Sequence, residues 1–362
     1  KTRVTTAVCI CRQRERGKQM ARLTQFLSDD ELGELISAFP EAEFAFAYGS
    51  GVVKQQGYAE NVSNASDLPM LDLVLAVEDS EAWHKVNLER NRDHYSGLAR
   101  LFGAGGVAWL QEGFGAKLYY NALVPLSTTS HRGRSMKYGV ISTKHLAEDL
   151  TDWTWLYTAG RLQKPVRIIQ GNDKASAIIE GNLLSAAKAS LLLLPERFSA
   201  QEFYTTVAGL SYTGDFRMYF GENPDKVKNI VSATLGRFQD LYAPALKGIP
   251  GMTATGPDCS SYVQDVSPTT RLTLARSLPR AVRGLLPLGQ GGSAGNKLAT
   301  GGAPLTAEVS RALATVVSRS SLRQGAKGLL TAGVLKSASY SLAKVTQAIA
   351  GRRKRQESPS GQ

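Results

Sequence analysis

The chain has 362 residues, a formal net charge of +12, and apolar and charged fractions that argue against wholesale disorder. The cysteines Cys9, Cys11 and Cys259 exclude a disulfide framework and lack zinc-ligand spacing, so we expect a reducing compartment and no structural metal. The basic charge favours anionic partners such as nucleic acid, nucleotide or an acidic membrane surface. No apolar run approaches the ~20 residues of a membrane-spanning helix, so any work on lipid would proceed from the surface.

The first predicted segment, residues 1–22, is rich in Arg and Thr and contains one acid. This composition is typical of a mitochondrial transit peptide or its remnant, and equally of a frayed basic tail.

Residues 23–160 alternate between strand and helix patterns and predict one α+β domain. A capping box formed by Ser28 and Glu31 opens a helix that ends before Pro40. We expect strands at 43–48, 70–77, 117–126 and 135–142, helices at 81–102 and 143–158, and a glycine-rich turn at 103–106.

Residues 161–265 are mostly helical and predict a winged-helix-like or other small helical domain. We expect helices at 175–194 and 225–243, with a second capping box, Ser199 and Glu202, opening another between them. The remaining region, 266–362, holds a glycine-rich stretch at 284–304 and a basic, helical C-terminus.

The stretch FAFAYGSGVV places the turn Gly49-Ser50-Gly51 at the end of an apolar strand. Such a turn brings backbone N–H groups close to a phosphate, or it is a plain tight turn. A dinucleotide fingerprint and a P-loop are both absent from the sequence.

Asp72 lies inside the apolar strand MLDLVLAV, where a carboxylate is costly unless it is paired or bound to metal. A Gly-Ser turn followed by an acid in the next strand is the pattern of polymerase-β-like nucleotidyltransferases. The alternative is an aspartate at a strand edge that caps a turn. The pattern's second acid is replaced here by Val74, so further metal ligands would come from Glu78, Asp79, Glu148 or Asp149.

No histidine spacing or nucleophile elbow indicates a general base. A phosphate monoester nucleophile needs none, because its second pKa of about 6 leaves it largely deprotonated at neutral pH. The remaining difficulty is the repulsion between two anions, which Mg²⁺, Lys and Arg would relieve.

Eight motifs in order carry a resemblance: FAYGSGV, LDLVLAV, AWHKVNLERNRDHYSGL, YYNAL, KYGVIS, EDL with LYTAGRLQKPV, AGLSYTGDFRM and SSLRQGAKGLLTAG. Between about residues 26 and 345 the chain closely resembles the mitochondrial phosphatidate cytidylyltransferase family, the translocator-assembly-and-maintenance type of CDP-diacylglycerol synthase. The resemblance implies a nucleotidyltransferase domain, a winged-helix domain and a C-terminal region. It implies Mg²⁺-dependent synthesis of CDP-diacylglycerol and pyrophosphate from CTP and phosphatidic acid, upstream of cardiolipin, as a peripheral enzyme on the matrix side of the mitochondrial inner membrane.

The resemblance also implies roles for individual residues. Gly49, Ser50 and Gly51 would hold the CTP phosphates, and Asp72 would ligate Mg²⁺ with Asp149 as a candidate second ligand. Catalytic roles fall on Asp72, Lys137, Arg161 and Lys164, and substrate binding also on Tyr138, Asp215 and Arg217. For Arg161 and Asp215 the alternative is a salt bridge that holds the domains together.

The segment 334–355 predicts an amphipathic helix with an apolar stripe and a basic end. It would bind the anionic inner-membrane surface, or pack on the protein's own core with its basic run in solvent. The membrane-binding residues expected there are Leu342, Lys344, Val345, Ile349, Arg352 and Arg353.

Two other classes of function stay open. A nucleic-acid-binding protein or RNA nucleotidyltransferase fits the charge and the polymerase-like turn, but the sequence shows no aromatic platforms along a basic groove, so we expect no nucleic acid partner. A non-catalytic mitochondrial assembly factor fits Val74, if metal binding has been lost. The oligomeric state is not indicated.

Overall fold

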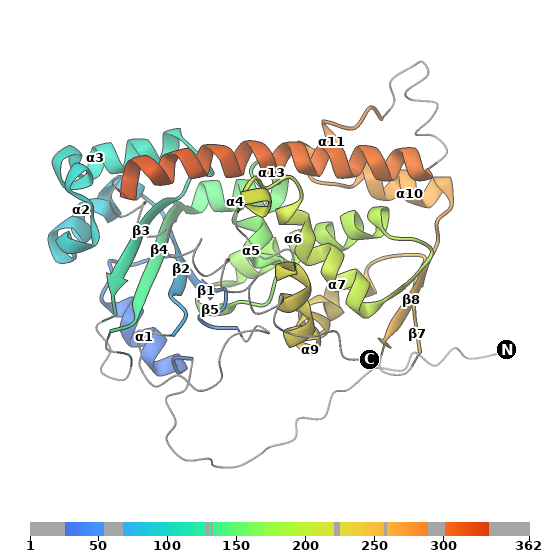
Figure 1. The fold of residues 1–362 in the computed structure, drawn as a ribbon, viewed down its shortest axis with the longest axis horizontal. Helices are drawn as coiled ribbons and strands as arrows, with labels where there is room; N and C mark the ends of the chain where they lie inside the picture. Colours follow the sequence, from blue (N-terminus) through green and yellow to red (C-terminus); the bar gives the residue numbers. More distant parts are fainter. Residues whose placement is uncertain are drawn as a thin grey trace, which may run out of the picture.

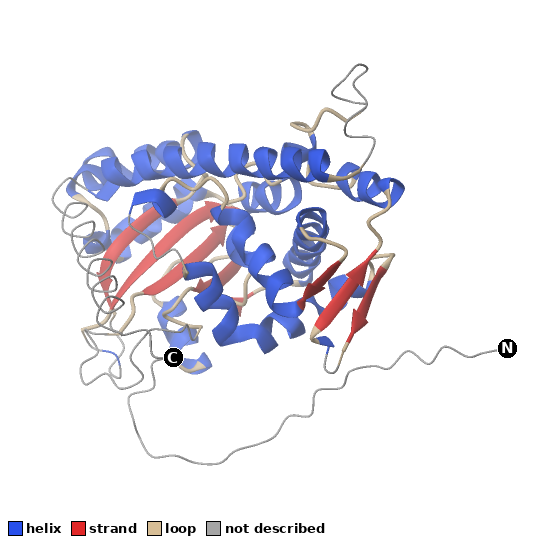
Figure 2. Ribbon diagram, turned by 45° about the vertical axis from the view of Figure 1, so that its right-hand side comes forward, coloured by secondary structure: helices blue, strands red, loops and turns tan. Residues whose placement is uncertain are grey.

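A computed structural model describes residues 26–53, 68–126, 131, 133–220, 225–256, 259–288 and 301–332. It shows an α+β protein in which a five-stranded sheet lies beside a helical region with a small second sheet, and one long helix runs along both (Figures 1 and 2). The segments 1–22 and 334–355, with the six predicted membrane-binding residues, lie outside the described residues.

The elements of the first part alternate between strand and helix, as the patterns predicted. They are α1 (Asp29–Ser37), β1 (Phe44–Tyr48), β2 (Leu71–Val77), α2 (Ser80–Arg90), η2 (Arg92–His94), α3 (Gly97–Gly113), β3 (Tyr119–Pro125), β4 (Ser135–Ser142), α4 (Thr143–Asp152), α5 (Ala159–Leu162) and β5 (Arg167–Gln170).

The elements of the second part are mainly helices. They are α6 (Asp173–Leu193), β6 (Arg197–Ser199), α7 (Ala200–Gly209), η4 (Leu210–Tyr212), α8 (Arg217–Phe220), α9 (Lys226–Lys247), β7 (Met252–Thr255), β8 (Ser261–Gln264), α10 (Pro268–Arg276), α11 (Arg280–Arg283) and α13 (Ala303–Ala332).

The large sheet has the strand order β3-β4-β2-β1-β5, and all four predicted strands are present. β2 pairs antiparallel with β1 and parallel with β4, which places Asp72 between Tyr48 and Lys137. β5 pairs with β1 at one edge. The sheet therefore continues past the boundary that we expected at residue 160.

Two cores cover the two faces of this sheet. On one face, Leu73 and Leu75 pack with residues of α1 and α2. On the other, Phe46 and Val74 join a core that continues through α6, α7, α9 and α13. Because that core is continuous, the sheet and the helical region pack as one body.

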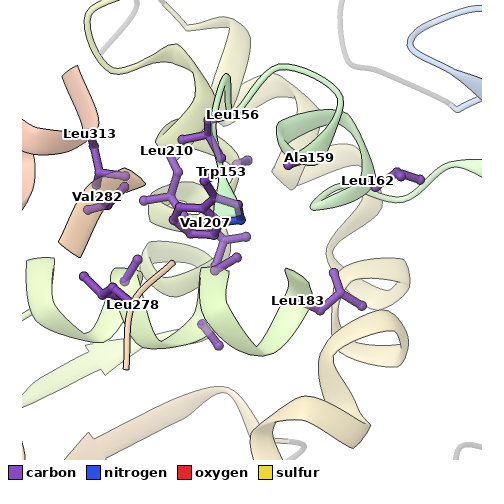
Figure 3. Packing of buried hydrophobic residues seen from close by; sticks show 14 of the residues in the cluster. Trp153, Leu156, Ala159, Leu162, Leu183, Val207, Leu210, Leu278, Val282 and Leu313 are labelled. Atoms are coloured by element: carbon purple, nitrogen blue, oxygen red, sulfur yellow. The ribbon is translucent and has the colours of Figure 1, made fainter. Parts of the chain in front are cut away.

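Trp153 lies in this larger core, among side chains from several elements (Figure 3). It adopts a left-handed conformation with φ 54° and donates its indole N–H to Asn182 Oδ1 at 2.8 Å. α4 ends at Asp152 and Trp153 caps it, so the predicted helix 143–158 is too long. The physical reason is Asp149, whose carboxylate accepts backbone N–H groups from Trp155, Tyr157, Thr158 and Ala159 and holds the chain in a loop.

The predicted helix 81–102 is also divided. Asn91 departs from helical geometry, so α2 ends there and α3 starts afresh after its cap, Ser96. The glycine-rich turn expected at 103–106 instead lies within α3, where Gly103 has a φ of 65° and kinks the helix.

The second part contains the short sheet β6-β8-β7, whose strand β6 contacts α7. Both capping boxes have the predicted reciprocal hydrogen bonds, at Ser28 with Glu31 and at Ser199 with Glu202. α13 crosses the molecule and contacts α6, α11 and β3 (Figure 1). Over the described ranges, no helix combines the length and apolarity needed to cross a bilayer.

A buried polar network lies between α2, α3 and the sheet. His84 bonds Tyr95 Oη at 2.8 Å and Gln111 Oε1 at 2.9 Å, and Asn87 bonds both Tyr95 and Tyr138. Burial lowers the pKa of His84 to about 4, because the charged imidazole would be desolvated there.

This network predicts acid sensitivity. Below its ordinary pKa the unfolded chain protonates His84 while the folded protein does not, so stability falls as the pH falls from 6.5 to 4, by about 3 kcal/mol. Urea unfolding across this range measures the loss, and His84→Gln is expected to show a shallower pH dependence. Equal slopes for the two proteins would contradict the assignment.

Candidate functional site

The glycine turn meets Asp72 because of the register between β1 and β2. Tyr48 lies opposite Asp72, so Gly49, with a φ of 79°, follows directly beside the carboxylate. A Cβ built on Gly49 would lie 3.4 Å from Asp72 Oδ2, and Ser50 is half-buried in the same turn. Gly49 therefore lies against the carboxylate.

Gly51 has a different environment. A Cβ there would lie 2.6 Å from the backbone oxygen of Met70, so the chain's own backbone occupies that space. Arg134 fixes the approach, because its guanidinium donates to the carbonyls of Gly51 at 2.9 Å and Pro69 at 2.8 Å. The plain tight turn is therefore the better interpretation for Gly51.

Arg134 was not among the predicted site residues, although the basic HRGR motif lay between two predicted strands. Its side chain is buried, and burial lowers its pKa to about 10. Sequence could flag the charge of this motif but not its two carbonyl partners, which come from distant segments.

Asp72 and Lys137 form an ion pair at the centre of the site. Lys137 Nζ lies 2.6 Å from Asp72 Oδ1, and each side chain is 21% exposed. Apart from this ion pair, that buried oxygen has no further partner among the described residues. The pair fits a carboxylate whose lone pairs are directed at cations.

Arg161 packs over tyrosine rings that lie next to this ion pair. Its guanidinium lies 4.0 Å from the ring centre of Tyr157 and 5.0 Å from that of Tyr48. Lys137 lies 5.4 Å from the ring of Tyr120, whose hydroxyl is 3.5 Å from that of Tyr48. Arg161 makes no ion pair within the described part of the chain, so the alternative of a domain-bridging salt bridge is not seen there.

Lys164 and Lys226 extend the positive charge toward α9. Both ammonium groups lie over the ring of Tyr212, at 5.0 and 5.5 Å, and Lys164 donates to Ser211 Oγ at 2.9 Å. Burial, with the nearby charges of Arg161 and Lys226, lowers the pKa of Lys164 to about 7. Lys226 was missed, because one lysine at a helix start carries no signal in the sequence.

Asp215 and Arg217 form the last part of the site. Arg217 binds the buried Asp215 carboxylate through Nε at 3.0 Å and Nη2 at 2.5 Å, while its own side chain stays 42% exposed. Burial raises the pKa of Tyr157, but the charges of Arg161, Arg217 and Lys137 outweigh burial and leave it below its ordinary value. The cations therefore converge, and Asp215 orients one of them.

We call these five side chains the cationic cluster. Its members are Lys137, Arg161, Lys164, Arg217 and Lys226. Four of the five were predicted as site residues. Lys137, Arg161 and Lys164 each lie over a tyrosine ring, and the charges of Lys137, Arg161 and Arg217 all act on Tyr157. Five cations face the two carboxylates Asp72 and Asp215, and such an excess favours a polyanionic ligand.

Two predicted residues lie apart from this arrangement. The hydroxyl of Tyr138 is buried on the opposite face of the sheet, where Asn87 and Asn121 donate to it at 3.0 and 2.8 Å. Asp149 uses its oxygens for the four backbone N–H groups described above. Neither side chain points into the cluster.

The structure fits a magnesium site built on the single carboxylate of Asp72 better than a site built from several protein ligands. No group of three potential metal-binding side chains occurs in the described ranges. Mg²⁺, however, is commonly held by one or two carboxylates together with substrate phosphates and water. Asp72, with Oδ1 beside the Lys137 ammonium and Oδ2 beside Gly49, suits that mode.

Comparison with known proteins gives independent support for a polyanionic ligand. A family model described as mitochondrial phosphatidate cytidylyltransferase matches residues 32–347. The mouse protein of that name is 40% identical over 326 residues, covering 87% of this chain and 94% of the relative. The zebrafish protein is 40% identical over 89% of this chain and 95% of its own length, and that of Schizosaccharomyces pombe 38% over 85% and 80%.

These relatives define an enzyme class, the nucleotidyltransferases of cytidylyl type. The chain belongs to the mitochondrial phosphatidate cytidylyltransferase family.

The glycine turn yields a stability prediction. Gly51→Ala is expected to destabilise the fold by ~2 kcal/mol or more, because the new methyl overlaps backbone that cannot move freely. Gly49→Ala is expected to cost ~1–2 kcal/mol from its left-handed backbone alone. Denaturant unfolding measures both, with Gly33→Ala in α1, which has open space around it, as the matched control. A larger loss for Gly49→Ala than for Gly51→Ala would reverse the assignment.

The lowered pKa of Lys164 yields a second prediction. Between pH 7 and 10 the unfolded chain keeps this lysine protonated while the folded protein releases the proton, so the burial penalty is relieved as the pH rises. The stability of the wild type relative to Lys164→Met should therefore rise, by at most ~1.4 kcal/mol per pH unit. Unfolding curves at three pH values test this, and a constant difference would show that Lys164 does not titrate there.

Proposed function

We propose that this chain transfers a cytidylyl group from CTP to phosphatidate and releases CDP-diacylglycerol and pyrophosphate. The names of its relatives supply the substrate class. The observation that carries the proposal is the cationic cluster around Asp72, because the reaction brings two polyanions together and its main barrier is their repulsion.

In this proposal the phosphatidate phosphate attacks the α-phosphorus of CTP, the bond to the β-phosphate breaks, and pyrophosphate leaves. Asp72 would hold Mg²⁺, which supplies Lewis-acid stabilisation of phosphate oxygens when bound. Lys137, adjacent to Asp72, and Arg161 screen the approaching anions. A protein base is not required, since a phosphate monoester is largely deprotonated at neutral pH.

The second part of the cluster suits the other end of the phosphate chain. Lys164 and Lys226 are held over Tyr212, and Arg217 is oriented by Asp215. An anion placed among them restores the protonated form of Lys164, so binding there is coupled to uptake of a proton.

The architecture is consistent with this function. We propose that the sheet with the Gly49 turn and Asp72 is a polymerase-β-like nucleotidyltransferase domain. The order α6, β6, α7, α9, β7, β8 and the sheet order β6-β8-β7 support a winged-helix-like second domain. The cluster draws on both, since Lys137 comes from β4 and Lys226 from α9.

We also propose a setting for the reaction. The names of the relatives support mitochondria, and a phosphatidate substrate supports a peripheral position on the matrix side of the inner membrane, upstream of cardiolipin. The basic segment 334–355 would add an anionic-membrane anchor.

A direct assay tests the proposal. The purified chain is incubated with labelled CTP and phosphatidate vesicles, with and without Mg²⁺. Formation of labelled CDP-diacylglycerol and pyrophosphate only with Mg²⁺ is the expected result. Absence of product with every lipid tried would refute the activity.

Asp72 is the residue on which turnover should depend most. Asp72→Asn removes the charge directed at the metal and leaves Lys137 uncompensated, so turnover should fall by roughly a thousandfold. Asp152→Asn is the matched control, because Asp152 pairs with the exposed Arg280 away from the cluster. Near-normal turnover in Asp72→Asn, with the control also unchanged, would remove Asp72 from the mechanism.

A further inference from the structure

The helix α3 exposes a row of large apolar side chains. Leu101 is 78% exposed, Phe102 67% and Trp109 65%, and Leu98 and Phe114 are about half exposed. Leu98, Leu101 and Phe102 recur at helical spacing before the kink at Gly103, and Trp109 and Phe114 follow the kink with their rings 5.1 Å apart. We call Leu98, Leu101, Phe102, Trp109 and Phe114 the α3 stripe.

Such a stripe is not ordinary surface. Single exposed apolar residues are common, but several along one helix mark an interaction site. Arg100 is the only charged residue between Gly97 and Gln111. The large exposed fractions show that these side chains project into solvent. The stripe is therefore suited to insert into a deformable partner and not to form a pocket for a ligand.

A basic surface lies at the same end of the molecule. Gln324 on α13 accepts the Ala116 N–H at 2.9 Å, and Lys327 donates to the carbonyl of Phe114 at 3.0 Å. These hydrogen bonds hold α13 against the residues that follow α3 (Figure 1). The outer side of this part of α13 exposes Arg319, Leu322 and Arg323. Neither arginine forms an ion pair with the described residues.

We propose that the α3 stripe inserts into an anionic lipid bilayer. This inference rests on the proposed function, because phosphatidate carries two acyl chains and is presented by a bilayer. The three aromatic side chains of the stripe, next to its two leucines, suit the boundary between headgroups and acyl chains. The arginines of α13 complement anionic headgroups, each contributing on the order of 1 kcal/mol near the surface.

The position of α3 relative to the cluster supports a bilayer over another protein. The chain passes from Phe114 directly into β3, whose Tyr120 lies under the Lys137 ammonium. One short stretch of chain therefore connects the bilayer-binding helix α3 with the site. A second copy of the chain in that place would cover the approach of a lipid substrate.

Trp109 provides the most direct test. The other tryptophans are Trp83 and Trp153, which are buried, and Trp155, which is half-buried. Full-length protein is mixed with vesicles of phosphatidate and bromine-labelled phosphatidylcholine, and tryptophan emission is recorded. We expect quenching that Trp109→Phe largely removes. Unquenched emission with bound protein would show that another segment is the anchor and would overturn the inference.

A pair of variants separates this inference from the proposed function. Leu101→Gln with Phe102→Gln should weaken vesicle binding roughly tenfold or more, since two large apolar side chains no longer leave water. Ile168→Gln, at an exposed residue of β5, is the matched control and should bind normally. Turnover by the double variant should fall on vesicles but persist on water-soluble short-chain phosphatidate.

The outcomes are distinct. No turnover by the wild type on either substrate refutes the proposed function. Normal vesicle binding by the double variant overturns the inference and leaves the proposed function standing. A wild-type dimer in sedimentation that the double variant dissociates would assign the stripe to self-association and also overturn it.

Discussion

The pairing of β2 with its two neighbours places Tyr48, Asp72 and Lys137 in adjacent positions on one face of the sheet. Side chains alternate along a strand, so a slip of one residue would turn Asp72 into the apolar core beneath. The strongly apolar residues of β2, buried on both faces, fix the register against that slip. The hydrophobic cores therefore position Asp72, one of the two carboxylates around which the cations gather.

The cationic cluster is unfavourable in the absence of an anion. Five cations share a partly buried volume with two carboxylates, and the lowered pKa of Lys164 shows the cost. Tyrosine rings reduce that cost, because their negative faces lie toward Lys137, Arg161 and Lys164. The fold thus accepts local instability at the site, and the ligand's negative charge relieves it.

Sequence predicts the parts of this protein that local chemistry decides. Both capping boxes, the four strands and Asp72 follow from short patterns, and the eight motifs identify the family. Contacts between distant segments are different. Lys226 comes to the site through its contact with the distant Tyr212, and the edge strand β5 pairs with β1 although about 120 residues separate them. The early end of α4 depends on one carboxylate that gathers four N–H groups, which no helix propensity reveals.

The connection between α3 and β3 extends the same reasoning to the surface. Lys327 donates to the carbonyls of Gln111 and Phe114, where the helix dipole favours a positive charge. Gln324 then bonds the backbone on both sides of Lys117, at Ala116 and Leu118. Every polar backbone group fixed in this way reduces the freedom of α3 relative to β3. The apolar surface of α3 and the Tyr120 ring at the site are therefore held in one geometry by α13.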